Sequence, residues 1–360
     1  MSAHDPLLPH RNAIDEIDAA VLRLLNERAG HARAIGELKG TGVVYRPERE
    51  AEVLRRIQSL NTGPLPGEAV ARLFREIMSE CLAVERPLTI AYLGPAGTFT
   101  QQAAVKHFGH AAHTQACTTI DECFRMVEAR RADYVVAPVE NSTEGSVGRT
   151  LDLLSVSPLQ ACGEVVLRIH HHLLRKDHAQ MAGISKVYAH AQALAQCHDW
   201  LSRHLPDAVC ISVSSNAEAA RLAAQSGEAG VAAIAGQSAA EIYQLVKVAE
   251  NIEDEPNNTT RFLVLGHQDT APTGRDKTSL VNSTPHKAGA VNALLKPFTE
   301  LGISMTKFES RPSRSGLWDY LFFIDIEGHR NDAKVQQALA ELGERASFVK
   351  VVGAYPQAVL

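Results

Sequence analysis

The chain has 360 residues, of which 45% are hydrophobic, 21% charged and 5% aromatic, and its formal net charge is -5. This composition is typical of a globular protein, and the length predicts two or three domains. The acidic balance argues against a nucleic-acid partner, and no apolar run of about 18 residues that would span a membrane is found. Six scattered cysteines without a CxxC pair indicate reduced thiols and a cytoplasmic protein.

Residues 1–87 are predicted to be entirely helical. Apolar residues recur three and four positions apart in the first helix, which is expected over about residues 7–39. A second helix is expected from Pro47, because proline suits the first turn of a helix, and a third covers residues 68–85. Helices of such unequal length make a poor core alone, so the sequence predicts an intertwined helical dimer.

Arg28 interrupts the apolar seam of the first helix between Leu24 and Ile35. A buried cation without a partner costs several kcal/mol, so Arg28 either reaches solvent or a glutamate, or it meets the anion of a ligand. Lys39 shares its helix face to within about 20° and lies about 16 Å further along the axis. Arg11 points elsewhere and would serve the opposite site in a dimer.

Residues 88–266 alternate strands with helices, which predicts an α/β domain with mostly parallel strands and its functional groups at their carboxyl ends. Three polar stretches stand out: GPAGTFTQQAA (94–104), PVENSTEGS (138–146) and NNTTRFLVLG (257–266). The first lacks the lysine of a phosphate loop, which argues against a nucleotide. In IHHHLL (169–174) consecutive side chains on a strand alternate faces, so a metal site is not expected.

The polar stretch 266–277 is expected to be a linker to a last domain over residues 278–355. Its predicted order of elements is βαββαβ, which is a ferredoxin-like α+β module. The expected elements are a strand at 278–284, a helix at 289–300, strands at 303–311 and 317–327, a helix at 331–343 and a strand at 347–355.

The first segment resembles the helical chorismate mutase domain in LLPHRNAIDEIDAAVLRLLNERAGHARAIGELK, YRPERE and RLFREIMSECLAVE. That family rearranges chorismate, a dicarboxylate, to prephenate in a pericyclic step that needs placed cations but no nucleophile or metal. The resemblance implies carboxylate binding by Arg28, Arg49 and Arg11 of a partner subunit, contacts at the ether oxygen from Lys39 and Glu85, and a contact from Glu50 to the ring hydroxyl.

GPAGTFT, ENS and TTRF in combination make the whole segment 88–266 resemble prephenate dehydratase, with a two-lobed fold like that of periplasmic binding proteins. The resemblance implies that Thr260 is the hydrogen-bond donor at the departing hydroxyl, and that Arg261 binds a substrate carboxylate or shapes its loop. The other residues implied to line the site are Thr98, Glu140, Asn141, Ser142 and Gln192. Ala189 and Ala191 depart from the family pattern around Gln192.

HKAGAVNALLKPF and KFESRPSRSGLWDYLFFIDI make the last segment resemble an ACT domain. The resemblance implies allosteric binding of phenylalanine at a subunit interface, with feedback inhibition. The implied binding residues are Gly289, Ala290, Val291, Glu309, Ser310 and Arg311. Val291 is smaller than the usual residue of the motif.

The three segments together imply a bifunctional chorismate mutase–prephenate dehydratase family member of phenylalanine biosynthesis, without a cofactor, acting as a dimer or a dimer of dimers. One alternative is a dehydratase whose helical segment only dimerises, or which prefers arogenate. Another is a ligand-binding regulator without catalysis. The cation set of the first segment argues against the first alternative, and Thr260 argues against the second.

Overall fold

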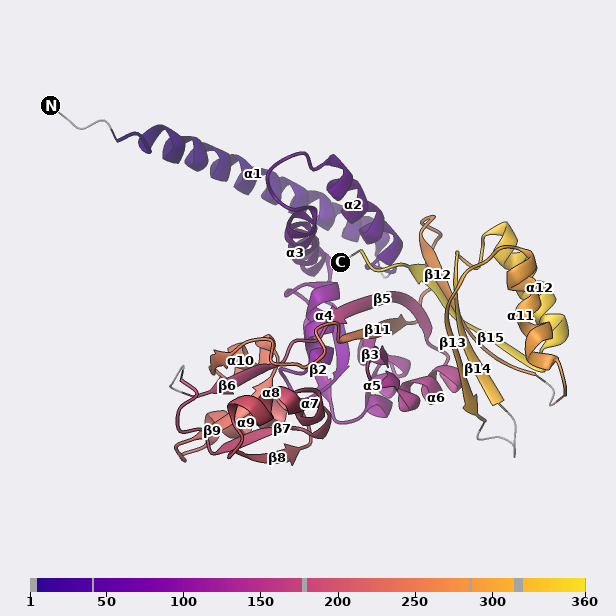
Figure 1. Ribbon diagram of the computed structural model, residues 1–360. Coiled ribbons are helices and arrows are strands. Elements are labelled where there is room, and N and C mark those ends of the chain that lie inside the picture. The colour runs from indigo at the N-terminus through magenta and orange to yellow at the C-terminus, as the bar shows by residue number, and fades with distance from the viewer. Residues whose placement is uncertain (1–4, 41, 177–179, 285–286, 314–319, 360) are drawn as a thin grey trace.

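The computed structural model describes residues 5–40, 42–176, 180–284, 287–313 and 320–359. Three bodies follow one another along the chain: a helical segment, a two-lobed α/β segment and a C-terminal α+β module (Figure 1). The predicted fold classes are therefore confirmed. Among the described residues, no helix is long and apolar enough to cross a membrane.

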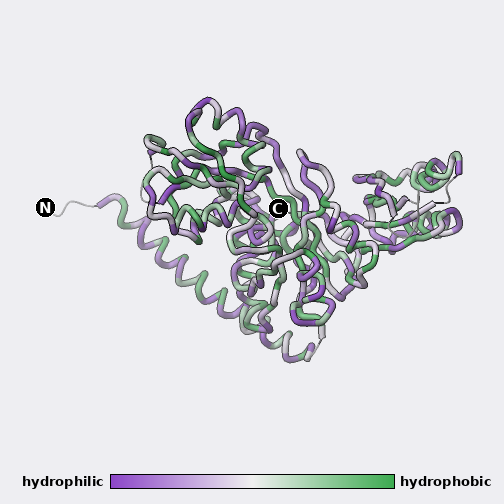
Figure 2. The backbone as a smooth tube through the Cα atoms, turned by 90° about the horizontal axis from the view of Figure 1, so that it is seen from below, coloured by the Kyte–Doolittle hydropathy of each residue, from purple (hydrophilic) through white to green (hydrophobic). Residues whose placement is uncertain are grey.

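The helical segment consists of α1 (Leu8–Lys39), α2 (Pro47–Leu60) and α3 (Gly67–Glu85). The C-terminal part of α1 packs on α3, while its N-terminal part extends away from the molecule (Figure 1). No residue of α1 is buried, although hydrophobic stretches recur along it (Figure 2). The exposed apolar residues of this stripe are Ile14, Ile17, Val21, Leu24, Ile35 and Leu38.

The α/β segment contains two sheets, one in each lobe. The first lobe has the strand order β2-β1-β3-β11-β5, with β4 on β3, and the second has β10-β6-β9-β7-β8. The strands of the first lobe are β1 (Thr89–Leu93), β2 (His113–Cys117), β3 (Tyr134–Asn141), β4 (Gly145–Ser146), β5 (Gln160–Arg168) and β11 (Thr259–Gly266). Those of the second are β6 (His172–Arg175), β7 (Lys186–His190), β8 (Val209–Val213), β9 (Val231–Ala235) and β10 (Val246–Ala249).

The helices of this segment are short and follow individual strands, as the alternating pattern predicts. In the first lobe they are α4 (Phe99–Phe108), α5 (Ile120–Glu128) and α6 (Gly148–Val156). In the second they are α7 (Ala191–Gln196), α8 (His198–His204), α9 (Asn216–Gln225) and α10 (Gln237–Ile242).

The expectation of mostly parallel strands needs a correction at β6 and β11, which run against their neighbours. The chain crosses between the lobes twice, from β5 to β6 and from β10 to β11. Each crossing enters a lobe at the edge where the parallel strands end, so the entering strand runs in the opposite direction. The start of β11 therefore lies beside the end of β3, at the junction between the lobes.

The glycine-rich turn after β1 packs directly against the second lobe. Gly97 has a φ of 89°, and a Cβ atom there would lie 3.0 Å from the Cα of Ala239 on α10. The Tyr243 hydroxyl donates a 3.0 Å hydrogen bond to the carbonyl oxygen of Ala96. Glycine at position 97 thus allows both the backbone conformation and the close contact between the lobes.

The C-terminal module has the predicted βαββαβ order. Its elements are β12 (Asp276–Ser283), α11 (Ala290–Glu300), β13 (Met305–Pro312), β14 (Tyr320–Glu327), α12 (Ala333–Arg345) and β15 (Phe348–Pro356). The sheet order is β13-β14-β12-β15, and both helices cover one face of this sheet (Figure 1). Residues 317–319 of the predicted third strand lie outside the described residues.

The other face of this sheet shares a hydrophobic core with the first lobe. Val281, Phe323 and Val352 of the module lie in one buried cluster with Val139 and Leu263 of the lobe. The stretch 266–277, expected to be a linker, is accordingly packed rather than loose, because Thr270 is buried and donates a hydrogen bond to the carbonyl oxygen of Ala354. The module thus packs directly against the lobe that carries β11.

Candidate active sites

Lys39 and Glu85 meet where the end of α1 crosses the end of α3. The Lys39 Nζ lies 3.3 Å from the Glu85 Oε1 and donates a second hydrogen bond, 3.2 Å long, to the carbonyl oxygen of Val44. The Glu85 side chain is only 6% exposed. An ammonium group and a carboxyl group are thus held together at the position where the sequence predicts contacts to the substrate ether oxygen.

Gly36 makes room for this pair. A Cβ atom at position 36 would lie 2.4 Å from the Cγ of Glu85, well inside van der Waals contact. The glycine therefore lets the carboxyl-bearing side chain pack against the backbone of α1.

Arg28 lies about three turns before Lys39 on α1 and is half-exposed. Among the described residues no carboxylate pairs with it, so the predicted alternative of a glutamate partner is not found in this part of the chain. Arg11 pairs with Asp5 at 3.1 Å and lies about 42 Å from Lys39 along the same helix. One subunit thus cannot bring its own Arg11 to Lys39.

Two other predicted mutase residues lie apart from this pair. The Arg49 guanidinium binds Glu52 at 3.1 Å on an exposed helix face. The Glu50 Oε1 accepts a 3.2 Å bond from the Arg75 Nε, and burial raises the pKa of Glu50 while Arg75 partly offsets that rise. In the described residues no polar contact joins Glu50 to Lys39 or Arg28.

Glu50 instead belongs to the junction with the α/β segment. The hydroxyl of Tyr45, next to Glu50 in space, lies 2.9 Å from the Nε2 of His107 on α4. Burial lowers the pKa of His107 to about 3, so this imidazole is neutral in the folded protein at neutral pH. Arg75 donates to the carbonyl oxygen of Lys106 at 2.9 Å, which ties α3 to α4.

In the α/β segment the structure brings Asn141 and Thr260 together, as partners across the β3–β11 pair. The Asn141 Nδ2 donates 2.8 Å hydrogen bonds to the Thr260 Oγ1 and to the Asn258 Oδ1. The Asn141 Oδ1 accepts from the backbone N–H groups of Thr143 and Glu144, at 3.0 and 3.1 Å. Since a backbone N–H group can only donate, the Asn141 side-chain oxygen has to face these two groups, and the orientation of its amide is fixed.

Sequence reasoning missed three residues beside this pair: Thr143, Gln196 and Asn258. Asn258 and Thr143 lie two positions from Thr260 and Asn141, but outside β11 and β3, in the loop and the turn that adjoin these strands. Their place in the sequence beside the two motifs was the available signal for both. Gln196 comes from α7 in the second lobe, and only the tertiary fold places it here, where its Nε2 donates to the Thr143 Oγ1 at 3.0 Å.

Thr98 and Ser142, predicted to bind substrate, use their hydroxyls on the backbone. The Thr98 Oγ1 donates to the carbonyl oxygen of Leu93 and caps α4 by accepting from the Gln101 N–H. The Ser142 Oγ accepts from the N–H of Thr259 at 3.0 Å and lies 3.3 Å from the carbonyl oxygen of Asn257. Both side chains shape the loops at the junction. Gln192 lies at the start of α7, where its N–H contacts His190.

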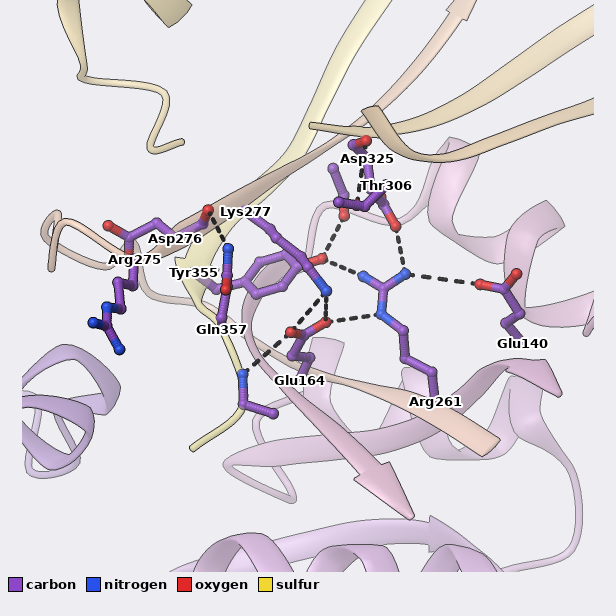
Figure 3. A network of polar contacts seen from close by, with 12 residues as sticks. Glu140, Glu164, Arg261, Arg275, Asp276, Lys277, Thr306, Asp325, Tyr355 and Gln357 are labelled. Atoms are coloured by element: carbon purple, nitrogen blue, oxygen red, sulfur yellow. Dashed lines mark hydrogen bonds and ion pairs between the residues drawn. The ribbon is translucent and has the colours of Figure 1, made fainter. Parts of the chain in front are cut away.

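Glu140 and Arg261 do not lie with Thr260, because they occupy the opposite face of the sheet. The Arg261 guanidinium donates to Glu164 at 2.8 Å, to Asp325 and, at 2.8 Å, to the hydroxyl of Tyr355 (Figure 3). Its Nη1 also lies 4.0 Å from the Glu140 Oε2. The expected contact of Arg261 with a substrate carboxylate is thus replaced by a buried network that reaches the C-terminal module.

Two lysines of the module complete this network. The Lys277 Nζ lies 3.0 Å from both carboxylate oxygens of Glu164, and the Lys307 Nζ lies 3.1 Å from the Glu140 Oε2. The buried Arg261 guanidinium needs its carboxylate partners Glu164 and Asp325, since an unpaired buried charge costs several kcal/mol.

The three consecutive histidines have three separate environments. The His170 Nδ1 lies 2.8 Å from Glu253, the His171 Nε2 lies 2.9 Å from the Gln196 Oε1, and the His172 Nδ1 accepts from the N–H of Asn251. Within the described ranges, no group of three or more histidine, cysteine or acidic side chains is placed to hold a metal ion.

The residues predicted to bind phenylalanine fall into two groups on the C-terminal module. Gly289, with a φ of 79°, precedes α11, and Ala290 and Val291 form its first turn. Glu309, Ser310 and Arg311 lie on β13. In the described part of the chain no hydrogen bond or ion pair joins the two groups.

Arg311 instead faces α6 of the first lobe. Its Nη2 lies 3.4 Å from Asp152, and a Cβ atom at position 148 would lie 2.5 Å from its Nη1, so Gly148 leaves the space for this contact. The β13 edge of the module is therefore a second point of attachment to the first lobe, beside the Arg261 network.

The fold and these sites define a class of three-part enzyme, with a helical, an α/β and a regulatory α+β segment. Comparisons with protein families agree with this class. Family sequence models match at residues 10–86 (chorismate mutase type II), 90–270 (prephenate dehydratase) and 280–344 (ACT domain). The bifunctional chorismate mutase/prephenate dehydratase of Neisseria gonorrhoeae is 76% identical, over 98% of each chain. That of Pseudomonas aeruginosa is 50% identical, over 100% of each.

A solved structure supports the arrangement of the last two segments. The prephenate dehydratase of Arthrobacter aurescens, determined in complex with L-Phe, is 33% identical and superimposes with a TM-score of 0.69, covering 75% of this chain and 90% of its own. The chain belongs to the family of bifunctional chorismate mutase/prephenate dehydratases. It is an enzyme with both activities and carries an ACT domain.

The contact between Gly36 and Glu85 yields a test of the mutase site. Gly36→Ala should lower the mutase kcat/KM by roughly tenfold or more, because the new methyl group displaces Glu85 and small misplacements of a site residue are costly. Gly30→Ala on the same helix meets no atom within 4 Å and should leave the rate unchanged. Chorismate consumption measures both variants, and equal rates would show that Glu85 does not need this position.

Proposed function

We propose that the enzyme converts chorismate to prephenate in residues 1–87 and prephenate to phenylpyruvate in residues 88–266, under control of residues 278–355. The observation that carries the second step is the Thr260 hydroxyl, whose oxygen accepts a hydrogen bond from Asn141 while its own hydrogen has no acceptor among the described residues. Such a hydroxyl can donate to a substrate.

For the mutase step, the enzyme needs to hold the compact conformer of chorismate and to stabilise negative charge on the breaking ether oxygen. The Lys39 ammonium is the proposed donor to that oxygen, with Glu85 beside it. Arg28, with no protein anion of its own in the described chain, is the proposed carboxylate ligand. Arg49 and Glu50 are proposed to complete the site at the second carboxylate and the ring hydroxyl.

For the dehydratase step, the ring C–OH bond and the bond to the ring carboxylate break together, and the electrons of the carboxylate bond form the aromatic ring. The hydroxide takes up a proton and leaves as water, and the carboxylate leaves as carbon dioxide. Thr260 is the proposed hydrogen-bond donor to the departing oxygen; a threonine hydroxyl is too weak an acid to be a free general acid. Gln192, Thr98 and Ser142 are proposed to line the substrate space.

Thr260 and its neighbour provide a matched pair of variants for this role. Thr260→Val should abolish phenylpyruvate formation and leave chorismate consumption intact, so that prephenate accumulates. Thr259→Val, one residue earlier and on the other face of β11, should keep both rates. Separate assays of chorismate loss and phenylpyruvate gain measure these outcomes.

Retained dehydratase activity in Thr260→Val would refute the assignment of Thr260. A wild-type protein that turns over supplied prephenate but not chorismate would instead favour the alternative in which the helical segment only dimerises.

We also propose that the protein forms a homodimer, or a dimer of such dimers, through the exposed apolar stripe of α1. The stripe is too extensive to face water, and no residue of α1 is buried in one subunit. Arg11 lies far from Lys39 on the same helix, and an antiparallel partner helix would bring its Arg11 to that site.

A cytoplasmic location, where the thiols stay reduced, agrees with the six free cysteines.

Mixed dimers test the shared site. A tandem-purified dimer of one Arg11→Ala chain and one Lys39→Ala chain should contain one intact mutase site out of two, and thus about half of the wild-type mutase rate. Dimers of either variant alone should have almost none, and dehydratase rates should be equal throughout. A mixed dimer as inactive as the parents would place each mutase site within a single chain.

Feedback inhibition by phenylalanine is the proposed role of the ACT domain. The L-Phe complex of the Arthrobacter relative and the match of residues 280–344 support it. The proposed ligand residues are the two groups around Gly289 and Arg311, brought together across a subunit interface. Inhibition requires a difference in phenylalanine affinity between two states of the enzyme, and the Arg261 network is the proposed link between the ACT domain and the strand of Thr260.

A further inference from the structure

Four side chains at the junction of the lobes form a closed ring of hydrogen bonds. The Asn141 Nδ2 donates to the Asn258 Oδ1 at 2.8 Å, and the Asn258 Nδ2 donates to the Gln196 Oε1 at 3.0 Å. The Gln196 Nε2 donates to the Thr143 Oγ1 at 3.0 Å, and the Thr143 hydroxyl donates back to the Asn141 Oδ1 at 2.6 Å. Every member donates to the next in the same sense.

The direction of the ring is fixed by the backbone. Two N–H groups, of Thr143 and Glu144, point at the Asn141 oxygen, so the nitrogen of that amide has to face Asn258 and Thr260. For each later member of the ring, the reversed orientation would set two donors or two acceptors against each other. Only one orientation is therefore possible. The His171 Nε2, 2.9 Å from the Gln196 oxygen, carries its hydrogen for the same reason.

The ring spans both lobes of the dehydratase. Asn141 and Thr143 belong to the first lobe, Gln196 lies at the end of α7 in the second, and Asn258 lies in the segment that returns between them. The ring of hydrogen bonds is therefore complete only when the two lobes lie at the separation that they have in this structure. Aligned hydrogen bonds also polarise one another, so a closed chain holds each member more firmly than isolated pairs would.

Thr260 is a branch of this ring. Asn141 has two amide hydrogens, of which one serves Asn258 and the other the Thr260 Oγ1 at 2.8 Å. A hydroxyl oxygen that accepts such a bond directs its own hydrogen elsewhere. We propose that Thr143 and Asn258 are positioning residues that, through Asn141, hold Thr260 as a donor toward the substrate when the lobes are closed; this rests on the role proposed for Thr260.

The test compares Thr143→Val with Thr143→Ser in the full-length protein. Valine has the size of threonine but opens the ring, whereas serine keeps the hydroxyl. We expect Thr143→Val to lower the dehydratase kcat about tenfold, with KM for prephenate within about twofold, because the position of the donor changes and substrate binding does not. Thr143→Ser should restore kcat to near the wild-type value.

Asn258→Asp is a second variant that breaks the ring, since a carboxylate cannot donate to the Gln196 oxygen. It tests the proposal if Thr143→Val fails to fold. It should show the same selective loss of kcat. The mutase rate of the same polypeptide reports intact protein in each case. Dehydratase kcat within twofold of wild type in the folded variants would overturn the proposal.

The Thr260→Val variant separates this proposal from the one on which it rests. An inactive Thr260→Val dehydratase together with fully active ring variants would remove the ring and leave Thr260 in place. An active Thr260→Val enzyme would remove both.

Discussion

The antiparallel pairing of β11 with β3 is the constraint on which the arrangement of this enzyme depends. It sets Thr260 opposite Asn141 and Arg261 opposite Glu140. Because successive residues of a strand point to opposite faces, the first pair faces the junction of the lobes and the second faces the C-terminal module. A shift of register by one residue would exchange the two faces. The closed ring of amides on one side and the ion network on the other both hold this register.

The two faces differ in their electrostatics. The junction face uses neutral amides and hydroxyls, whose directions are set by backbone N–H groups. The other face buries a guanidinium: burial lowers the pKa of Arg261, but Tyr355, Asp325 and Glu164 raise it by more, so Arg261 stays charged. Two of these three partners belong to the ACT domain. Since an uncompensated buried charge is costly, any movement of that domain has to be accommodated at β11, next to the hydroxyl that is the proposed hydrogen-bond donor.

Local sequence signals predicted the elements well and the contacts between segments less well. Apolar periodicity, Pro47 and the glycine-rich turns are local features, and they placed the long first helix and the βαββαβ order. Thr260 and Asn141 were found through motifs of a family, and Thr143 and Asn258 adjoin these motifs in the turn after β3 and the loop before β11. The partners of Arg261 and Glu50 were not predictable, because Asp325, Tyr355 and Arg75 reach them only through packing of distant segments. Gln196 likewise depends on how the second lobe meets the first.

The most direct test of this division of β11 is to measure kcat and KM for prephenate and the inhibitory phenylalanine concentration in Asp325→Asn and in Glu327→Gln. Both changes remove one carboxylate charge from β14, but Glu327 is exposed and lies outside the network. We expect a KM within about twofold of wild type in both variants, and an inhibitory phenylalanine concentration about tenfold higher in Asp325→Asn alone. A KM that changes about tenfold in Asp325→Asn, with the phenylalanine response unchanged, would contradict it and show that Arg261 serves the substrate.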